Sequence, residues 1–313
     1  MNIDSKIFVA GHKGMVGSAI FRKLQKDGYT NIVTATHKEL DLTSQIDTFD
    51  YFITNQFDYV FLAAAKVGGI YANSTYPADF TYENIMIETN VIKACHLSNV
   101  KKLLYLGSSC IYPRDCQQPI KEEYLLTGPL EKTNDGYAIA KIAGITMCQK
   151  FNEQYGTNYI SVMPTNLYGP GDNYHLENSH VFAALIRKFH EAKINNDESV
   201  RIWGTGTPFR EFLHVDDLAE AVVFLMRKYN SSEIVNIGTG KDLSIKDLAL
   251  MIKDVVEFKG EIVFDSSKPD GTPKKLLDVS KINKLGWKHS IEIEDGLKMT
   301  YSDFLINYSK YIK

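Results

Sequence analysis

A tyrosine and a lysine near the middle of the chain lie four residues apart, a common pattern that gains weight for proton transfer to a carbonyl from Ser108, about thirty residues earlier. The segment "GYAIAK" (136–141) places Tyr137 and Lys141 four residues apart, in a pattern that predicts a helix over 135–155 ending before Gly156. Residues four apart project from one face of a helix, so the ammonium group of Lys141 would lie beside the phenol. We expect this charge to lower the pKa of Tyr137 from its ordinary value of about 10, as a proton donor to a carbonyl needs near neutral pH.

A serine and a cysteine follow an apolar run in the segment "LGSSCIYP" (106–113). Ser108 comes directly after a predicted strand, and nucleotide-binding α/β folds place their chemistry at the carboxyl ends of strands. Cys110 lies two residues beyond Ser108. A single cysteine is most often a small buried apolar residue. Its place beside Ser108 nevertheless makes Cys110 a candidate for the same chemistry.

Short apolar runs alternate with helical patterns through the first half of the chain. Alternating strands and helices build a parallel sheet that helices cover on both faces. We therefore predict an α/β protein with a Rossmann-type, doubly wound parallel sheet and a smaller C-terminal α/β lobe for substrate. The predicted strands of the sheet are 6–11, 31–36, 59–65, 101–109 and 159–164.

Three glycines follow the first predicted strand and stand at the start of an amphipathic helix, in the segment "GHKGMVGSAIFRKLQ". They are Gly11, Gly14 and Gly17. Glycine permits a tight turn and a close approach of backbone N–H groups to a diphosphate, and the start of a helix favours negative charge. This placement after the first strand predicts a dinucleotide cofactor.

Basic residues near the end of the second predicted strand indicate NADPH rather than NADH. An NAD-binding protein usually places an acid there to hold the ribose 2′-hydroxyl. This chain has Thr36, His37 and Lys38 instead, and Lys13 lies in the glycine loop. None of these side chains would repel a 2′-phosphate, so we predict that the cofactor is NADPH/NADP⁺.

The chain divides into two predicted domains. Loops rich in glycine and proline become frequent after about residue 165. We predict an NADP(H)-binding domain over 1–165 and a substrate-binding lobe over 166–313. The apolar run 233–238 is predicted to return to the first sheet, so the chain would cross the boundary more than once.

Charge and composition argue against a function on nucleic acid or on a membrane. The 35 Lys and Arg and 38 Asp and Glu residues are interspersed and leave a formal net charge of −3, too small for such a field. We find no signal-peptide pattern and no apolar segment long enough to span a membrane. The cysteines lack CxxC spacing, which favours reduced thiols in a cytoplasmic protein, and we predict no metal site. Three cysteines are interpreted as core residues: Cys95, Cys116 and Cys148.

Longer strings are similar to one enzyme family, in order, along nearly the whole chain. The glycine pattern, Ser108, and Tyr137 with Lys141 resemble the extended short-chain dehydrogenase/reductase superfamily, which mostly acts on nucleotide-activated sugars. "LAAAKVGGIYANSTYPADF", "VMPTNLYGPGDN", "NSHV" (178–181), "WGTGTPFREFLHVDD" and "SSKPDGTPKKLLDV" resemble the GDP-L-fucose synthase family within it. The resemblance implies NADPH-dependent conversion of GDP-4-keto-6-deoxy-D-mannose to GDP-L-fucose, by epimerisation at C3 and C5 and reduction of the C4 ketone.

The same resemblance implies catalytic roles. A ketone at C4 acidifies the protons on C3 and C5, and inversion needs one group to remove a proton and another to return one from the opposite face. The family's pattern makes Cys110 the base and His180 the acid. Ordinary pKa values of about 8.5 for a thiol and about 6.5 for an imidazole suit these tasks. Ser108 and Tyr137 would hold the C4 oxygen during both steps, with Lys141 beside the phenol.

The resemblance further implies the ligand contacts and a homodimer. The implied NADP(H) contacts are Gly11, His12, Lys13, Gly14, Met15, Val16, Gly17, His37, Lys38, Asp41, Leu42, Ala63, Ala64, Ala65, Leu106, Gly107, Tyr137, Lys141, Pro164, Asn166, Leu167 and His180. The implied nucleotide-sugar contacts are Ser109, Lys188, Trp203, Arg210 and Asp270. Two of these positions depart from the family, because His37 and Lys188 stand where arginine is usual. At position 188 a point charge replaces a bidentate clamp for the diphosphate.

Other functions of the same fold are distinguished by single features. Sugar 4,6-dehydratases share the Tyr/Lys pair but place two acids after the serine, where this chain has Cys110 and Ile111. A C4-epimerase would need no thiol, and non-catalytic NADPH-binding proteins tend to lose the tyrosine or the lysine. A C4-reductase of a GDP-linked 4-keto-6-deoxy-heptose in surface polysaccharide biosynthesis, with or without epimerisation, stays open. One extra carbon changes discrimination by only about 1–3 kcal/mol.

Overall fold

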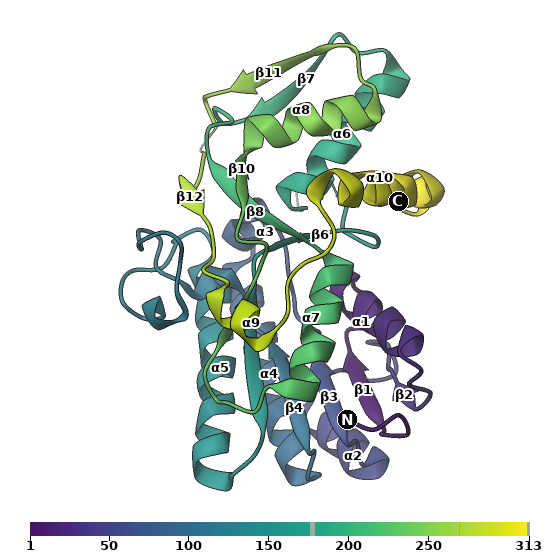
Figure 1. Ribbon diagram of the computed structural model, residues 1–313, viewed down its shortest axis with the longest axis vertical. Coiled ribbons are helices and arrows are strands. Elements are labelled where there is room, and N and C mark those ends of the chain that lie inside the picture. Colours follow the sequence, from purple (N-terminus) through teal and green to yellow (C-terminus); the bar gives the residue numbers. More distant parts are fainter. Residues whose placement is uncertain (176–178, 269, 312–313) are drawn as a thin grey trace.

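A six-stranded parallel sheet forms the larger lobe of this computed structural model, which describes residues 1–175, 179–268 and 270–311 (Figure 1). All neighbouring strands in the sheet are parallel. The sequence order reverses beside β1, as in a doubly wound sheet. The predicted α/β class is therefore confirmed. The strands lie in the order β2 (Ile32–Val33), β1 (Ile7–Ala10), β3 (Tyr59–Leu62), β4 (Lys102–Leu106), β5 (Tyr159–Pro164) and β9 (Val235–Ile237).

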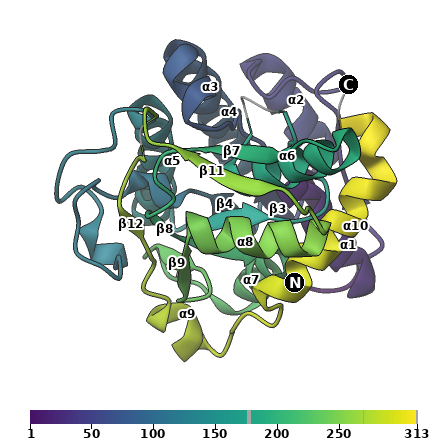
Figure 2. The ribbon, with the colours of Figure 1, turned by 90° about the horizontal axis from the view of Figure 1, so that it is seen from above.

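Helices cover both faces of this sheet (Figure 2). Two of them, α1 (Met15–Lys26) and α7 (Val215–Lys228), pack against each other on one face. The other face carries α2 (Gln45–Asn55), α4 (Pro77–Leu97) and α5 (Asp135–Tyr155). The predicted end of α5 is confirmed, because Gly156 caps it with a φ of 66°, in the left-handed region that glycine occupies without strain. The predicted second strand, 31–36, is longer than the observed one, since only Ile32 and Val33 of these described residues pair with β1.

The smaller lobe lies above the carboxyl ends of the main strands (Figure 1). Phe182, Phe189 and Phe304 lie in its apolar core, which is separate from that of the main sheet. Residues 176–178, including the first residue of "NSHV", lie outside the described residues. The main elements of this lobe are α6 (Val181–Asn195), β7 (Ser199–Trp203), α8 (Ile245–Val256), β11 (Glu261–Asp265) and α10 (Ile293–Tyr311).

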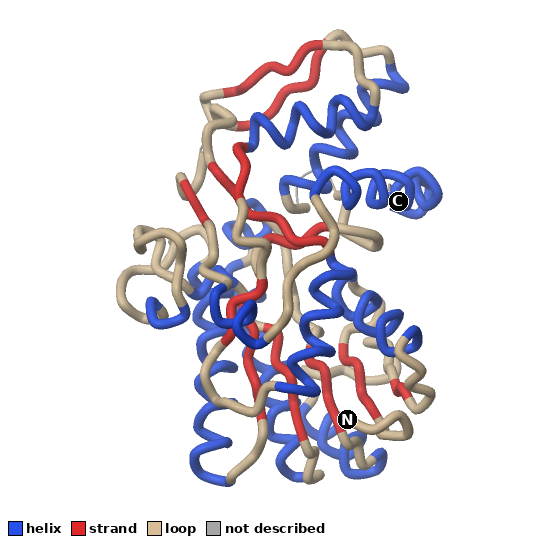
Figure 3. The backbone as a smooth tube through the Cα atoms, in the orientation of Figure 1, coloured by secondary structure: helices blue, strands red, loops and turns tan. Residues whose placement is uncertain are grey.

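Short strands and loops join the two lobes. Loops, drawn in tan, are frequent in this middle region (Figure 3). The chain enters it after β5 and returns as β9, which pairs with β5. The segment between β4 and α5 contains two 3-10 helices, η1 (Ser109–Ile111) and η2 (Glu122–Tyr124). The remaining short elements are α3 (Ile70–Thr75), β6 (Asn166–Tyr168), β8 (Phe209–His214), β10 (Asp242–Ser244), β12 (Lys274–Lys275) and α9 (Ser280–Leu285).

Membrane-spanning helices, metal ligands and thiols are three features of the described residues that matter for function. Within the described ranges, no helix is long and apolar enough to cross a membrane. The same ranges contain no group of three His, Cys, Asp or Glu side chains that could hold a metal ion. All four cysteines are free thiols, of which Cys95 and Cys148 are buried and Cys110 and Cys116 are partly exposed.

Candidate active site

The glycine loop between β1 and α1 has the geometry of a diphosphate cradle. Gly11 has a φ of 86°, and a Cβ there would lie 2.8 Å from the backbone nitrogen of Ala64. A Cβ at Gly17 would overlap the carbonyl oxygen of Gly11. Helix α1 starts after Gly14, which has no side chain to cap it, so backbone N–H groups of its first turn remain available to an anion. The loop therefore fits a dinucleotide diphosphate.

A carboxylate that was not predicted to matter lies in the loop after β2. The backbone N–H of Thr36 donates to Glu39 Oε2 over 2.8 Å. The pKa of Glu39 is lowered by its hydrogen bonds from Thr36, with smaller contributions from the charges of Lys13 and His12. Glu39 is thus a carboxylate next to the basic pair His37 and Lys38, and the prediction that no carboxylate would repel a 2′-phosphate did not take it into account.

Tyr137 and Lys141 project from one face of α5, as predicted, but the predicted effect on the pKa was wrong. Burial raises the pKa of Tyr137, the charges of Cys110 and Glu88 act in the same direction, and only a hydrogen bond with Ser108 opposes them. The Lys141 ammonium is 5.8 Å from the Tyr137 ring centre and donates to the carbonyl oxygen of Leu106 over 3.1 Å. Desolvation of the phenol is therefore the largest influence on its pKa.

Cys110 lies in a polar setting built from three separate segments. Its Sγ accepts from Asn134 Nδ2 at 3.2 Å and from Lys275 Nζ at 3.5 Å. Its backbone N–H donates to Ser108 Oγ at 3.2 Å, which caps η1. Asn134 precedes α5, and Lys275 lies on β12 beside Arg210 of β8. The thiol thus faces two side-chain donors and does not pack as a core residue.

These donors decide the ionisation of the thiol. Burial by itself raises the pKa of Cys110, but the charge of Lys275 and hydrogen bonds with Ser108, Lys275 and Asn134 outweigh it, so the pKa is lowered. In contrast, burial raises the pKa of Cys116, six residues further on. Because a thiolate is the nucleophilic and basic form of cysteine, Cys110 has the setting of a base and Cys116 does not.

His180 faces the same cation from the other lobe. It is the residue before the first turn of α6, and its side chain does not cap that helix. The residue has exposed surface, but atoms around the imidazole ring desolvate it enough to lower its pKa, and the charge of Lys275 acts in the same direction. Lys275 therefore contacts Cys110 and also acts electrostatically on His180.

The predicted nucleotide-sugar contacts come from several elements of both lobes. The charge of Arg210 interacts with both Cys110 and Asp270. Lys188 Nζ lies 5.4 Å from the ring of Trp203, whose side chain is 52% exposed. The carboxylate of Asp270 accepts from the backbone N–H and the hydroxyl of Thr205, so it also fixes the loop after β7. The last of the predicted contacts, Ser109, is buried within η1.

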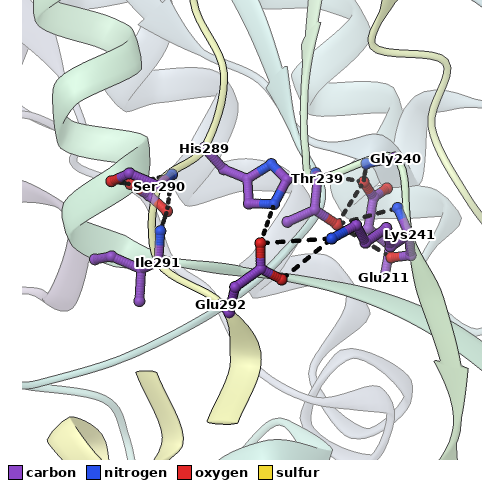
Figure 4. Close-up of polar contacts among 9 residues, drawn as sticks. Glu211, Thr239, Gly240, Lys241, His289, Ser290, Ile291 and Glu292 are labelled. Atoms are coloured by element: carbon purple, nitrogen blue, oxygen red, sulfur yellow. Dashed lines mark hydrogen bonds and ion pairs between the residues drawn. The ribbon is translucent and has the colours of Figure 1, made fainter. Parts of the chain in front are cut away.

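The remaining predicted cofactor residues lie along the carboxyl edge of the main sheet. Asn166 Nδ2 donates to the carbonyl oxygen of Glu211 over 2.8 Å, which ties the start of β6 to β8. The buried Glu211 carboxylate in turn accepts from the backbone N–H groups of Thr239 and Gly240, both over 2.7 Å (Figure 4), and of Leu277. Leu277 follows Lys275 by two residues, so Glu211 anchors the strand that carries this cation. The other members of this edge are Ala63, Ala64, Ala65, Leu106, Gly107 and Pro164, whereas Leu167 lies on β6, which pairs with β8.

Comparison with known proteins identifies the family. The chain matches the NAD dependent epimerase/dehydratase family over residues 7–238. It is 59% identical over 304 residues to "GDP-L-fucose synthase 1" of Arabidopsis thaliana, covering 97% of this chain and 94% of that protein. It is 54% identical over 315 residues to "GDP-L-fucose synthase" of Escherichia coli (strain K12), covering 98% of each.

The chain belongs to the GDP-L-fucose synthase family of NAD dependent epimerases/dehydratases. A similar solved structure is "MlghC, GDP-mannoheptose C4 reductase from Campylobacter jejuni with NADP bound". It has a TM-score of 0.90 and 44% identity, and the match covers 97% of this chain and 99% of that one. The family resemblance inferred from the sequence is confirmed.

Some residues of this family site were missed by sequence reasoning. Lys275 and Asn134 contact Cys110, and Glu88 lies 3.9 Å from Lys141. Lys275 is separated from Cys110 by 165 positions, and no local spacing connects the two. The string "SSKPDGTPKKLLDV" did point to its segment, but nothing in it distinguishes Lys275 from Lys274. Asn134 directly precedes the predicted helix, which is a signal that could have been used.

The contact between Lys275 and Cys110 gives a first prediction. We expect Lys275→Met to raise the pKa of Cys110, because burial would then act without the opposing ammonium charge. The rate of Cys110 alkylation by iodoacetamide, followed by mass spectrometry of its peptide, should therefore rise at higher pH than in the unchanged protein. Lys274→Met is the matched control, since Lys274 Nζ pairs with Asp242 at 3.1 Å. Identical alkylation profiles for Lys275→Met and the unchanged protein would contradict the contact.

Proposed function

We propose that the protein converts GDP-4-keto-6-deoxy-D-mannose to GDP-L-fucose, by epimerisation at C3 and C5 followed by NADPH-dependent reduction at C4. The observation that carries this proposal is the setting of Cys110, whose thiol meets Lys275 and Asn134 beside the Ser108 and Tyr137 hydroxyls. A reductase alone needs the hydroxyl pair but no thiolate. The names of the relatives at 59% and 54% identity support the same reaction.

In this proposal the epimerisation is a matched loss and gain of protons. The Cys110 thiolate removes the proton from C3 and, in a separate event, from C5, and His180 returns a proton from the opposite face. The electron pair of the broken C–H bond moves to the C4 oxygen, where Ser108 and Tyr137 donate hydrogen bonds. Because its lowered pKa leaves His180 mainly neutral at pH 7, it must take up a solvent proton before each delivery.

The reduction uses the same hydroxyls. NADPH/NADP⁺ is the cofactor, consistent with the NADP-bound relative, and when bound it supplies a hydride to C4. Tyr137 then donates its phenolic proton to the C4 oxygen, while Ser108 keeps its hydrogen bond to that oxygen. Burial of Tyr137 keeps the phenol protonated until this step.

We also propose the wider assignments that accompany this reaction. Region 1–165 with strand β9 would bind NADP(H), and region 166–313 would bind the GDP-sugar, with Lys188, Trp203 and Arg210 toward the nucleotide. A cytoplasmic location agrees with the four free thiols. A homodimer agrees with the exposed apolar side chains of Tyr82 on α4 and Ile139 on α5. Light scattering on the purified protein would contradict the dimer if it gave one chain's mass.

A second candidate function rests on the solved neighbour. Because that protein is named a GDP-mannoheptose C4 reductase, a GDP-linked 4-keto-6-deoxy-heptose is the competing substrate. The deciding experiment offers the hexose and heptose substrates separately with NADPH and identifies each product by NMR. The proposal expects GDP-L-fucose, with C3 and C5 inverted. Turnover of the heptose alone would replace it with the second candidate.

The basic residues of the glycine loop and of the loop after β2 give a prediction about cofactor choice. We expect NADPH to have a higher kcat/KM than NADH, with an advantage that shrinks as salt rises, because Lys13, His37 and Lys38 are exposed and screened. Steady-state kinetics with both cofactors at two ionic strengths would measure it. Glu39→Gln should increase the advantage by removing the carboxylate beside Thr36. Equal use of both cofactors at low salt would show that these residues form no 2′-phosphate pocket.

A further inference from the structure

The buried carboxyl group of Glu88 lies next to the Lys141 ammonium. Glu88 of α4 is 2% exposed and Lys141 of α5 is 3% exposed, and Glu88 Oε2 is 3.9 Å from Lys141 Nζ. The hydroxyl of Tyr105, on β4, donates to the same Oε2. The lack of a side chain at Gly144 leaves room for this carboxyl group. A Cβ there would overlap the Tyr105 phenol and lie 2.8 Å from Glu88 Oε2.

Burial of the Glu88 carboxyl group costs free energy. A buried acid is normally paired through both oxygens or neutral, but Glu88 Oε1 has no hydrogen-bond partner among the described residues. Burial raises the pKa of Glu88 to about 7, although Lys141 and Tyr105 act to lower it. Replacement by an apolar side chain would fill the space without this cost. A stability role therefore does not account for Glu88.

The electrostatic partner of Glu88 is the Lys141 ammonium, which is buried and therefore needs a counter-charge. Burial lowers the pKa of Lys141, and the charge of Glu88 is the influence that opposes it. Among the residues that the structure describes, the Lys141 ammonium has one hydrogen-bond acceptor, the carbonyl oxygen of Leu106. Tyr105 presents its ring to the ammonium at 4.8 Å, which adds a weaker cation–π attraction.

From this geometry we propose that Glu88 is a positioning residue for the reduction, a buried counter-ion that keeps the Lys141 ammonium charged and directed toward Tyr137 at working pH. The inference rests on the proposed reduction, which needs a charged Lys141 beside Tyr137. Glu88 touches neither the phenol nor the thiol of the site, so its effect passes through Lys141.

The titratable and charged groups around Glu88 come from two packed elements. Tyr105 is contributed by β4, and α5 contributes Lys141, Tyr137 and Cys148. Burial keeps both tyrosines and Cys148 neutral at pH 7, since it raises the pKa of each. The pH response of this cluster is therefore that of the Glu88–Lys141 pair.

The test substitutes Glu88→Gln, which keeps an acceptor for Tyr105 and removes the charge. Because the carboxylate raises the pKa of Lys141, its loss should make the ammonium deprotonate at lower pH. We expect the alkaline limb of the kcat–pH profile for ketone reduction to move downward by about 1 to 3 pH units, the effect of one charge at this distance. A merely structural role would lower kcat equally at all pH values. The matched control is Glu83→Gln on the same helix, a surface partner of Lys66.

A second measurement does not depend on turnover. Infrared titration of the unchanged protein should show a buried carboxyl group protonating near pH 7, which is lost in Glu88→Gln and retained in Glu83→Gln. If Glu88→Gln shows the same alkaline limb as the unchanged protein, the positioning role is wrong. If the unchanged protein reduces neither keto sugar, the proposed function is wrong. A carboxyl signal that still depends on Glu88 would then show that this failure lies in the function and not in the assignment of a buried, titrating Glu88.

Discussion

We expect Tyr137→Phe to lower NADPH-dependent reduction of a 4-keto sugar by at least about 10²-fold, the usual effect of removing a general acid. The phenol is the hydroxyl that can pass a proton to the C4 oxygen as the hydride arrives. NADPH binding should be largely retained, because the substitution leaves the aromatic ring in place. Stopped-flow measurement of NADPH oxidation and fluorescence titration of NADPH would separate the two effects.

The raised pKa of Tyr137 sharpens this expectation. Since burial keeps the phenol neutral, the unchanged enzyme should carry the proton in the ligand-free state and need no uptake before the reduction. Tyr155→Phe on the same helix is the matched control, because Tyr155 is 47% exposed and contacts the ring of His96. Turnover of Tyr137→Phe within a few-fold of the unchanged enzyme would show that another group donates the proton.

The main architecture was predictable because its signals are local. Gly11 and Gly17 lie where a side chain would meet backbone, and the bounds of α5 follow from one helical pattern and Gly156. The error at β2 arises where tertiary structure decides, since an edge strand pairs along one side and the chain leaves the sheet after Val33. Apolar runs therefore predicted which strands exist better than where they end.

The electrostatics of the site were less predictable, for a physical reason. The spacing of Tyr137 and Lys141 predicted their shared face, but the pKa of a phenol depends on how many atoms exclude water from it, and spacing does not show that. Lys275 and Glu88 reach the site from β12 and α4, through contacts that exist only after the lobes and helices pack. The catalytic roles themselves stay predictions that mutants must test.

The largest effect on epimerisation is expected from Cys110→Ala. Incubated in D₂O with GDP-4-keto-6-deoxy-D-mannose and NADP⁺, the unchanged enzyme should place deuterium at C3 and C5, because the proton that it removes exchanges with solvent before one returns. Cys110→Ala should lose this exchange, since it lacks the base, while Ser108 and Tyr137 can still polarise the ketone. NMR of the recovered sugar would measure both positions. Cys116→Ala is the matched control, because its thiol has a raised pKa and should be dispensable.

The same experiment separates the thiol from His180 and from reduction. With NADPH present, Cys110→Ala should reduce the ketone slowly and give a 6-deoxy sugar whose C3 and C5 centres are not inverted. His180→Asn should still exchange deuterium on the face from which Cys110 removes the proton, but should fail to invert, because delivery from the opposite face is lost. Exchange at the unchanged rate in Cys110→Ala would mean that Lys275 and Asn134 hold a thiol without a catalytic role. If the unchanged enzyme itself does not exchange, yet reduces a ketone that another enzyme has inverted, the chain is a C4-reductase alone.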